Sequence, residues 1–182
     1  LDDLPEELYP LVPHYEGAFA ELGAAGQPFT RVAERRAAST GGLRASFAIL
    51  SHALSADDRS PRLRFSLKTL DDRMEEALSV LRDLVFGLDP RDDARERDVL
   101  RQYHAATRAR LLNGGTAPAT AHARRGLTPE GHVRHVMDGL PALERATRLA
   151  EEYARRGPDL LAGIERIRDL ALRRGRWTAS FT

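Results

Sequence analysis

Apolar residues in the first part of the chain recur at intervals of three and four, the spacing of a helix with one buried face. This series predicts a helix over about 7–23. Its members are Leu8, Leu11, Val12, Tyr15, Phe19 and Leu22. Gly26 and Pro28 end this helix, and Pro28 suits the first turn of a second helix that reaches about Ala38. The chain therefore opens with two predicted helices.

The spacing of apolar residues changes to two after residue 42. Apolar residues over 43–54 alternate with polar or small ones, which predicts a strand. A second alternation over 62–68 places Leu63, Phe65 and Leu67 on one face and basic or polar residues on the other. We expect 55–61, the stretch SADDRSP, to be a loop. The two strands are close in sequence, so we expect them to pair antiparallel.

The remaining chain returns to a helical spacing up to about residue 174. Capping and turn residues predict helices over about 71–88 and up to about 112, 126 and 174. The expected starts of the later ones are Asp89, Thr128, Pro141 and Gly157. At the end of the chain Trp177, Ala179 and Phe181 alternate with polar residues, which predicts a short terminal strand over 176–182.

These elements predict an α+β fold in a single domain over 1–182. A small antiparallel sheet is covered by helices, and a largely helical excursion occupies about 90–174. By segment, 1–70 is helix–helix–strand–strand, 71–175 is helical, and 176–182 is the terminal strand.

Composition narrows the range of functions. The net charge of +1 predicts no strong field toward nucleic acid or membrane. The absence of cysteine excludes disulfides, thiolate metal sites and a cysteine nucleophile. No apolar run approaches the length of a membrane span and no signal peptide is visible, so we expect a cytoplasmic, bacterial protein. The opening LDDLPEEL lacks a methionine, which suggests a fragment of a longer chain.

The residues that commonly carry hydrolytic chemistry are not spaced for it. Zincin-type sites need two histidines four apart on a helix, and no pair here has that spacing. His132 and His135 are three apart and are interpreted as solvated surface. The motifs G-x-S-x-G, Walker A and G-x-G-x-x-G are absent. Paired carboxylates at 57–58, 71–72 and 92–93 fall at turns or helix starts and are interpreted as caps.

A series of arginines raises the question of nucleic-acid binding. Its members are Arg91, Arg95, Arg97, Arg101, Arg108, Arg110, Arg124 and Arg125. Acidic residues such as Asp93, Glu96 and Asp98 lie between them. The interleaving favours a solvated helix face with local ion pairs over a nucleic-acid site.

Gly41 and Gly42 separate the second helix from the first strand. They lack the lysine and serine of a phosphate-binding loop and precede a strand rather than a helix. We interpret them as a structural joint, in which Gly41 forms a left-handed helix cap and Gly42 permits an unusual backbone path. The alternative is that the following strand pairs with a peptide, or with a second copy, through β-augmentation. Its residues would be Leu43, Ala45, Phe47 and Ile49.

The order of these segments resembles a known family. The stretch LDDLPEELYPLVPHYEGAFAELGAAGQPFTRVAERRAASTGGLRASF resembles the presequence-protease branch of the insulinase/pitrilysin zinc metallopeptidases. SLKTLDDRMEEALSVLRDLV resembles that family's strand–helix unit. RARLLNGGTAPATAHARRGLTPEGHVRHVMDGLPAL resembles its helix, glycine-containing loop and Gly-Leu element. RRGRWTASFT resembles its terminal strand.

The resemblance implies a role. Such peptidases close a catalytic half, with an inverted His-x-x-Glu-His zinc site, against a non-catalytic half, and enclose unfolded peptides in a chamber. This chain lacks the zinc motif and resembles part of the non-catalytic half. The expected function is a chamber wall without hydrolytic activity of its own. The implied partners are the remainder of the peptidase and unstructured peptides, with zinc implied only for the parent's catalytic half, and the isolated fragment is expected to form homodimers.

Two other classes of function stay open on sequence. One is a stand-alone protein- or peptide-interaction module that uses a sheet edge or helix face. The other is a helical nucleic-acid-binding domain, which would require the arginines to cluster away from their acidic neighbours.

Overall fold

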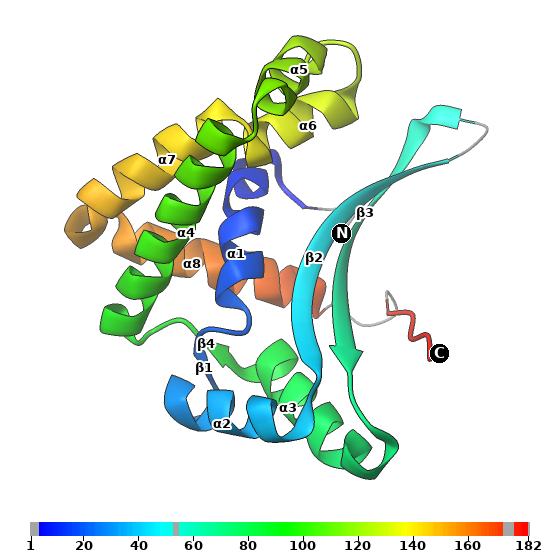
Figure 1. Ribbon diagram of the computed structural model, residues 1–182, viewed down its shortest axis with the longest axis vertical. Helices are drawn as coiled ribbons and strands as arrows, with labels where there is room; N and C mark the ends of the chain where they lie inside the picture. The colour runs from blue at the N-terminus through cyan, green and yellow to red at the C-terminus, as the bar shows by residue number, and fades with distance from the viewer. Residues whose placement is uncertain (1–3, 53–54, 173–176, 182) are drawn as a thin grey trace.

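A long curved β-hairpin stands beside a layer of helices in the computed structural model, which describes residues 4–52, 55–172 and 177–181 (Figure 1). The hairpin consists of β2 (Gly42–His52) and β3 (Ser55–Lys68). A second, very short antiparallel pair joins β1 (Gly23–Ala24) to β4 (Leu88–Asp89). The α+β class and the small antiparallel sheet are confirmed.

The first predicted helix divides into two parts. A 3-10 segment, η1 (Glu6–Leu11), leads into α1 (Val12–Ala18). Pro10 lies inside η1, where it removes a backbone donor that an α-helix would use, and a tighter turn accommodates this loss. The helix ends before the predicted boundary at residue 23, because Gly23 and Ala24 pair with β4 instead.

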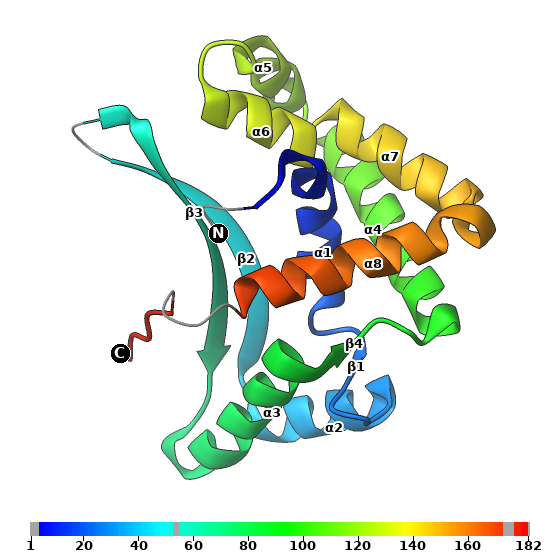
Figure 2. The same cartoon turned by 180° about the vertical axis from the view of Figure 1, so that it is seen from behind.

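Two helices form one end of the molecule. They are α2 (Phe29–Ser39) and α3 (Met74–Gly87), the latter preceded by the 3-10 turn η2 (Asp71–Arg73). Both views of the ribbon show α2 and α3 side by side below the hairpin (Figures 1 and 2). Pro28 precedes the first turn of α2, as its fixed φ predicts.

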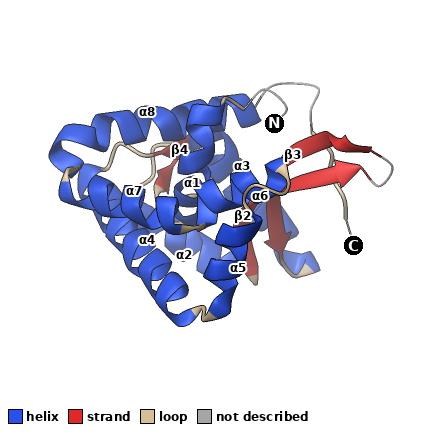
Figure 3. Cartoon of the chain, turned by 90° about the horizontal axis from the view of Figure 1, so that it is seen from above, coloured by secondary structure: helices blue, strands red, loops and turns tan. Residues whose placement is uncertain are grey.

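The hairpin is longer than the sequence indicates. Its antiparallel register runs from Gly42 opposite Lys68 to Leu50 opposite Ser60. The prediction of two antiparallel strands is confirmed, but the predicted loop over 55–61 is wrong, since these residues extend β3. Their local propensity for strand is low, and pairing with β2 overrides it. Seen from above, the hairpin projects from the helical layer (Figure 3).

The second half of the chain is helical, as predicted. It comprises α4 (Asp93–Asn113), α5 (Thr116–Arg124), α6 (Pro129–Asp138), α7 (Leu140–Glu151) and α8 (Tyr153–Ala171). The predicted cap at the start of α6 is confirmed, because the Thr128 hydroxyl accepts the N–H of Gly131 at 3.0 Å.

Three predicted boundaries in this half are wrong. Helix α4 begins at Asp93 rather than near Asp89, because the Asp92 side chain caps it by accepting the N–H of Arg95 at 3.1 Å. Helix α8 begins at Tyr153, ahead of the predicted Gly157 start. Pro158 therefore lies inside the helix. Residues 177–181, which fall within the predicted terminal strand over 176–182, are assigned to no strand.

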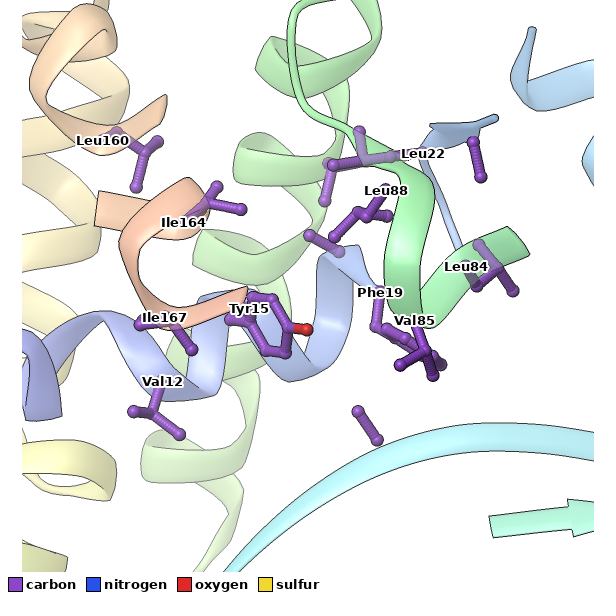
Figure 4. Packing of buried hydrophobic residues seen from close by; sticks show 14 of the residues in the cluster. Val12, Tyr15, Phe19, Leu22, Leu84, Val85, Leu88, Leu160, Ile164 and Ile167 are labelled. Atoms are coloured by element: carbon purple, nitrogen blue, oxygen red, sulfur yellow. The ribbon is translucent and has the colours of Figure 1, made fainter. Parts of the chain in front are cut away.

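The core forms around α1. Its side chains Val12, Tyr15 and Phe19 are fully buried. Figure 4 shows them between the apolar face of α8 and residues of the α3–β4 segment. The residues that meet them there include Leu84, Val85, Leu88, Leu160, Ile164 and Ile167. Each large side chain removed from water contributes roughly 1.5–3 kcal/mol, so this short helix contributes strongly to the stability of the helical layer.

Candidate functional site

The hairpin has an apolar inner face that is part of the core. The predicted pairing residues Leu43, Ala45, Phe47 and Ile49 lie on alternate positions of β2 and therefore share one face. Ala45 is buried, and the ring of Phe47 meets that of Tyr9 edge-on at 6.0 Å. These side chains anchor the hairpin to the helices, so only their backbone groups remain for a peptide.

The backbone of Phe47 points away from β3, toward α1. Its N–H donates a hydrogen bond to Oε1 of Glu16. Because backbone groups alternate in direction along a strand, those of the neighbouring odd-numbered residues turn toward the same edge. Glu16 therefore occupies one donor in the middle of the edge that the sequence suggested for pairing. Peptide pairing along Leu43–Ile49 stays a prediction.

Glu16 is the titratable group beside this edge. Burial raises the pKa of its carboxyl to about 7, the Phe47 N–H opposes this rise, and the negative charge of Asp138 adds to it. The sequence carried no signal for this residue, which stands among the apolar residues of the first helix.

The glycine joint has an ordinary backbone. Helix α2 ends at Thr40, which is extended with φ −125°, and Gly41 is not left-handed as the sequence suggested. The Gly41 N–H donates to the carbonyl of Lys68 at 2.7 Å, which closes the open end of the hairpin. Gly42 has φ 159°, close to full extension, so no unusual backbone path is required. The function of the two glycines as a joint stays a prediction.

The outer face of the hairpin is basic. Arg44, Arg64 and Lys68 are exposed there, and among the described residues no carboxylate forms an ion pair with any of them. Arg44 lies opposite Ser66, and therefore diagonally across from both Arg64 and Lys68. The sequence showed the alternation but did not bring the cations of the two strands together.

The arginine series of the helical half is largely neutralised. Arg95 binds Glu21 at 2.6 Å and Arg97 binds Asp93 at 3.2 Å. Arg91, Arg101 and Arg110 also contact carboxylates. This arrangement agrees with the solvated, ion-paired interpretation and does not support a nucleic-acid site.

A buried ion pair joins α1 to α4. Nε2 of His14 lies 2.5 Å from Oε1 of Glu96, and the side chains are 2% and 0% exposed. The ring of Tyr103 meets the His14 ring edge-on at 5.3 Å. His14 Nδ1 and Glu96 Oε2 have no hydrogen-bond partner among the described residues. The two positions are far apart in sequence, which is why sequence reasoning missed the pair.

The histidines of α5 and α6 are arranged differently from the expectation. His132 is exposed, but His135 is buried against the ring of His122 at 4.9 Å, so the interpretation of both as solvated surface is wrong for His135. Burial, and then the neighbouring positive groups His122 and Arg125, lower its pKa. Within the described ranges, no three histidine or carboxylate side chains gather as metal ligands.

In the described part of the chain, no helix has the length and apolar character needed to cross a membrane.

Comparisons with known proteins agree with the resemblance seen in the sequence. The mitochondrial presequence protease of Xenopus laevis is 27% identical over 175 residues, which cover 94% of this chain and 17% of that protein. The Xenopus tropicalis protein is 26% identical over 172 residues, with the same coverage. The presequence protease of Gibberella zeae is 24% identical over 186 residues, covering 100% of this chain and 18% of that protein.

The chain thus spans about a sixth of the length of these curated relatives. A family of domains associated with the metallopeptidases of subfamily 16C matches residues 1–149. Since that match covers most of the chain, the chain belongs to this family of peptidase-associated domains.

Proposed function

We propose that this domain forms part of the chamber wall of a zinc metallopeptidase that degrades unstructured peptides, and that it does not hydrolyse them itself. In this proposal the domain serves as a rigid, non-catalytic surface. The β2–β3 hairpin is the part turned toward the enclosed peptide.

The observation that carries the proposal is the family match over 1–149, together with relatives named presequence protease that are several times longer. A domain that occupies so small a share of a peptidase can contribute a wall without contributing the reaction. The exposed outer face of the hairpin supports its assignment to the peptide side, since it carries polar and basic side chains.

Zinc is assigned to the remainder of the full-length protein. The described residues do not bring together three ligands of the kind that zinc requires, so they do not fit the ion. We derive no step through zinc for this chain.

The wall function is tested by site-specific cross-linking in the full-length protein. A photoreactive amino acid replaces Ser46 on the outer face of β2, and a labelled unstructured peptide is added before illumination. Arg108 on α4 is the matched control, because it is exposed and lies on the helical layer. We expect labelling from position 46 and little from position 108. Equal labelling, or none from position 46, would contradict the wall function.

The inert character of the domain is tested separately. The purified 182-residue chain is incubated with zinc and a fluorogenic unstructured peptide. We expect no turnover. Chelator-sensitive cleavage that copurifies with the chain would show that it carries a catalytic site.

A further inference from the structure

We propose that the outer edge and outer face of β3 bind an extended peptide with acidic side chains at every second position. The peptide adds a third strand beside β3 and places its acidic groups over Arg44, Arg64 and Lys68. This needs only the hairpin, so it is independent of the proposed chamber and can fail separately from it.

The first argument is the unbalanced charge of the outer face. Most exposed arginines on the helices contact a carboxylate, as Arg97, Arg101 and Arg134 do. Arg44 and Arg64 are equally exposed and have no such contact within the described residues. Like charges at diagonal positions of a sheet repel, and a bound anion removes this repulsion.

The second argument is the direction of the backbone groups. The Phe47 N–H points away from β3 to Glu16, and Phe47 lies opposite Leu63. Residues opposite each other in an antiparallel pair turn their backbone groups the same way relative to the ladder, so those of Leu63 point to the outer edge of β3. Phe65 and Leu67 follow by alternation.

This outer edge has no strand partner. Among the described residues β3 pairs only with β2, and no hydrogen bond joins the N–H of Leu63, Phe65 or Leu67 to a residue outside the hairpin. The edge of β2 differs, because Glu16 and α1 lie against it. The open edge of the sheet is therefore that of β3.

The third argument concerns the occupant. A second copy of the chain, paired edge to edge, would bring the same cations together across the interface. An acidic peptide gains both the backbone hydrogen bonds and the opposite charges, which makes it the better match. Its residues on the other face would lie over the apolar side of the hairpin.

The geometry specifies which peptide N–H groups take part. A peptide residue opposite Leu63, Phe65 or Leu67 exchanges backbone hydrogen bonds with it and turns its side chain to the inner face. A residue opposite Arg64 turns its side chain to the outer face and its N–H to solvent. In an alternating Glu-Thr peptide, the threonine N–H groups therefore bind β3 and the glutamates meet the cations.

The test uses labelled peptides of about ten residues, a length that covers one strand. Their binding to the 182-residue chain is measured by fluorescence anisotropy. The alternating Glu-Thr peptide is expected to bind roughly tenfold more tightly than a peptide of equal composition with its glutamates in one block. Methylation of the threonine amides should abolish binding, and methylation of the glutamate amides should leave it unchanged. The emission of Trp177, the single tryptophan, gives a second readout, since its ring stacks on Phe65 at 5.8 Å.

A pair of variants tests the cations. Arg44→Gln/Arg64→Gln is expected to weaken binding by roughly tenfold or more, as expected for two lost charge-assisted contacts. The control Arg108→Gln/Arg124→Gln removes the same charge from exposed positions on α4 and α5 and should change the affinity less than about twofold. Circular dichroism verifies that both variants fold.

Several results would overturn the proposal. Equal affinity for the alternating and block peptides, or equal effects of the two methylations, would reduce the surface to a non-specific anion site. Tighter binding of a single-stranded oligonucleotide than of the acidic peptide would assign it to nucleic acid. Concentration-dependent dimers that exclude the peptide would show that a second copy is the occupant.

Discussion

His14 and Glu96 form an ion pair inside the protein, with Nε2 and Oε1 2.5 Å apart and both side chains withdrawn from solvent. Glu96→Ala leaves the histidine buried without its partner, so we expect a loss of about 3–5 kcal/mol in the free energy of unfolding, measured in urea. The double variant His14→Leu/Glu96→Met replaces the pair by apolar groups and should recover most of that loss. A double variant as unstable as Glu96→Ala would show that the cost comes from packing and not from the unpaired group.

Glu16 should make stability depend on pH. Its pKa in the folded protein is about 7, above the ordinary value of 4.5, so the folded state favours the protonated carboxyl. The resulting stabilisation is complete below pH 4.5 and is lost as the pH rises through 7. Because the group is partly solvated, we expect a difference of only about 1–2 kcal/mol.

The matched variant is Glu16→Gln, which keeps an acceptor for the Phe47 N–H. Its free energy of unfolding should match that of the natural chain at acidic pH and exceed it at alkaline pH. Measuring both proteins across the range removes the contribution of other titrating groups. Parallel curves at all pH values would contradict the assignment of a raised pKa to Glu16.

Arg35 holds α2 against α3. Its Nε contacts Glu76 and its Nη1 contacts Asp83, each at 2.8 Å, and Nη2 donates to Ser79 at 3.2 Å. Lysine carries one ammonium group and cannot reproduce this set of bonds, so Arg35→Lys should cost about 1–2 kcal/mol of unfolding free energy.

Arg31→Lys is the control, since Arg31 pairs with Glu34 on the exposed surface of the same helix and should cost less than about 0.5 kcal/mol. Thermal unfolding followed by circular dichroism checks both. Equal shifts for the two variants would show that the Arg35 network adds nothing beyond a surface charge.

Two glycines should respond in opposite ways to alanine. A Cβ on Gly139 would lie 2.5 Å from the carbonyl oxygen of His135, so Gly139→Ala is expected to destabilise by about 1–3 kcal/mol. Gly17 is exposed in α1 with open space around it. Gly17→Ala should therefore stabilise by about 0.5–1 kcal/mol through helix propensity. Urea titrations of the two variants provide the test, and a loss of stability at Gly17 would be inconsistent with this geometry.

Much of the fold follows from local pattern. The helix from Pro28, the antiparallel strands after Gly42 and the capped helix after Thr128 were predicted because spacing and caps act over a few residues. The opening helix ended early, because Pro10 and the pairing of Gly23 with β4 compete with its apolar spacing. The terminal strand was wrong: Trp177 stacks on Phe65 and Phe86 through its side chain, and the residues after it take no part in a ladder.

The candidate site was visible only in part. The alternation of β2 and β3 indicated a hairpin with one polar face, and the order of segments indicated the peptidase family. The position of Glu16 under Phe47 could not be predicted, since no periodicity relates a helix residue to a particular backbone donor. The grouping of Arg44 with Arg64 and Lys68 depends on the strand register, which a displacement by one residue would change.

The sequence by itself determined the class of fold, the type of most elements and the family, because each depends on patterns within a segment or on the order of segments. The tertiary structure decided the length of β3, the burial of His14 with Glu96, and the side of the hairpin on which an edge stays open. These depend on contacts between residues far apart along the chain. Their free energy comes from desolvation and backbone pairing in the assembled fold, and neither is encoded in local spacing.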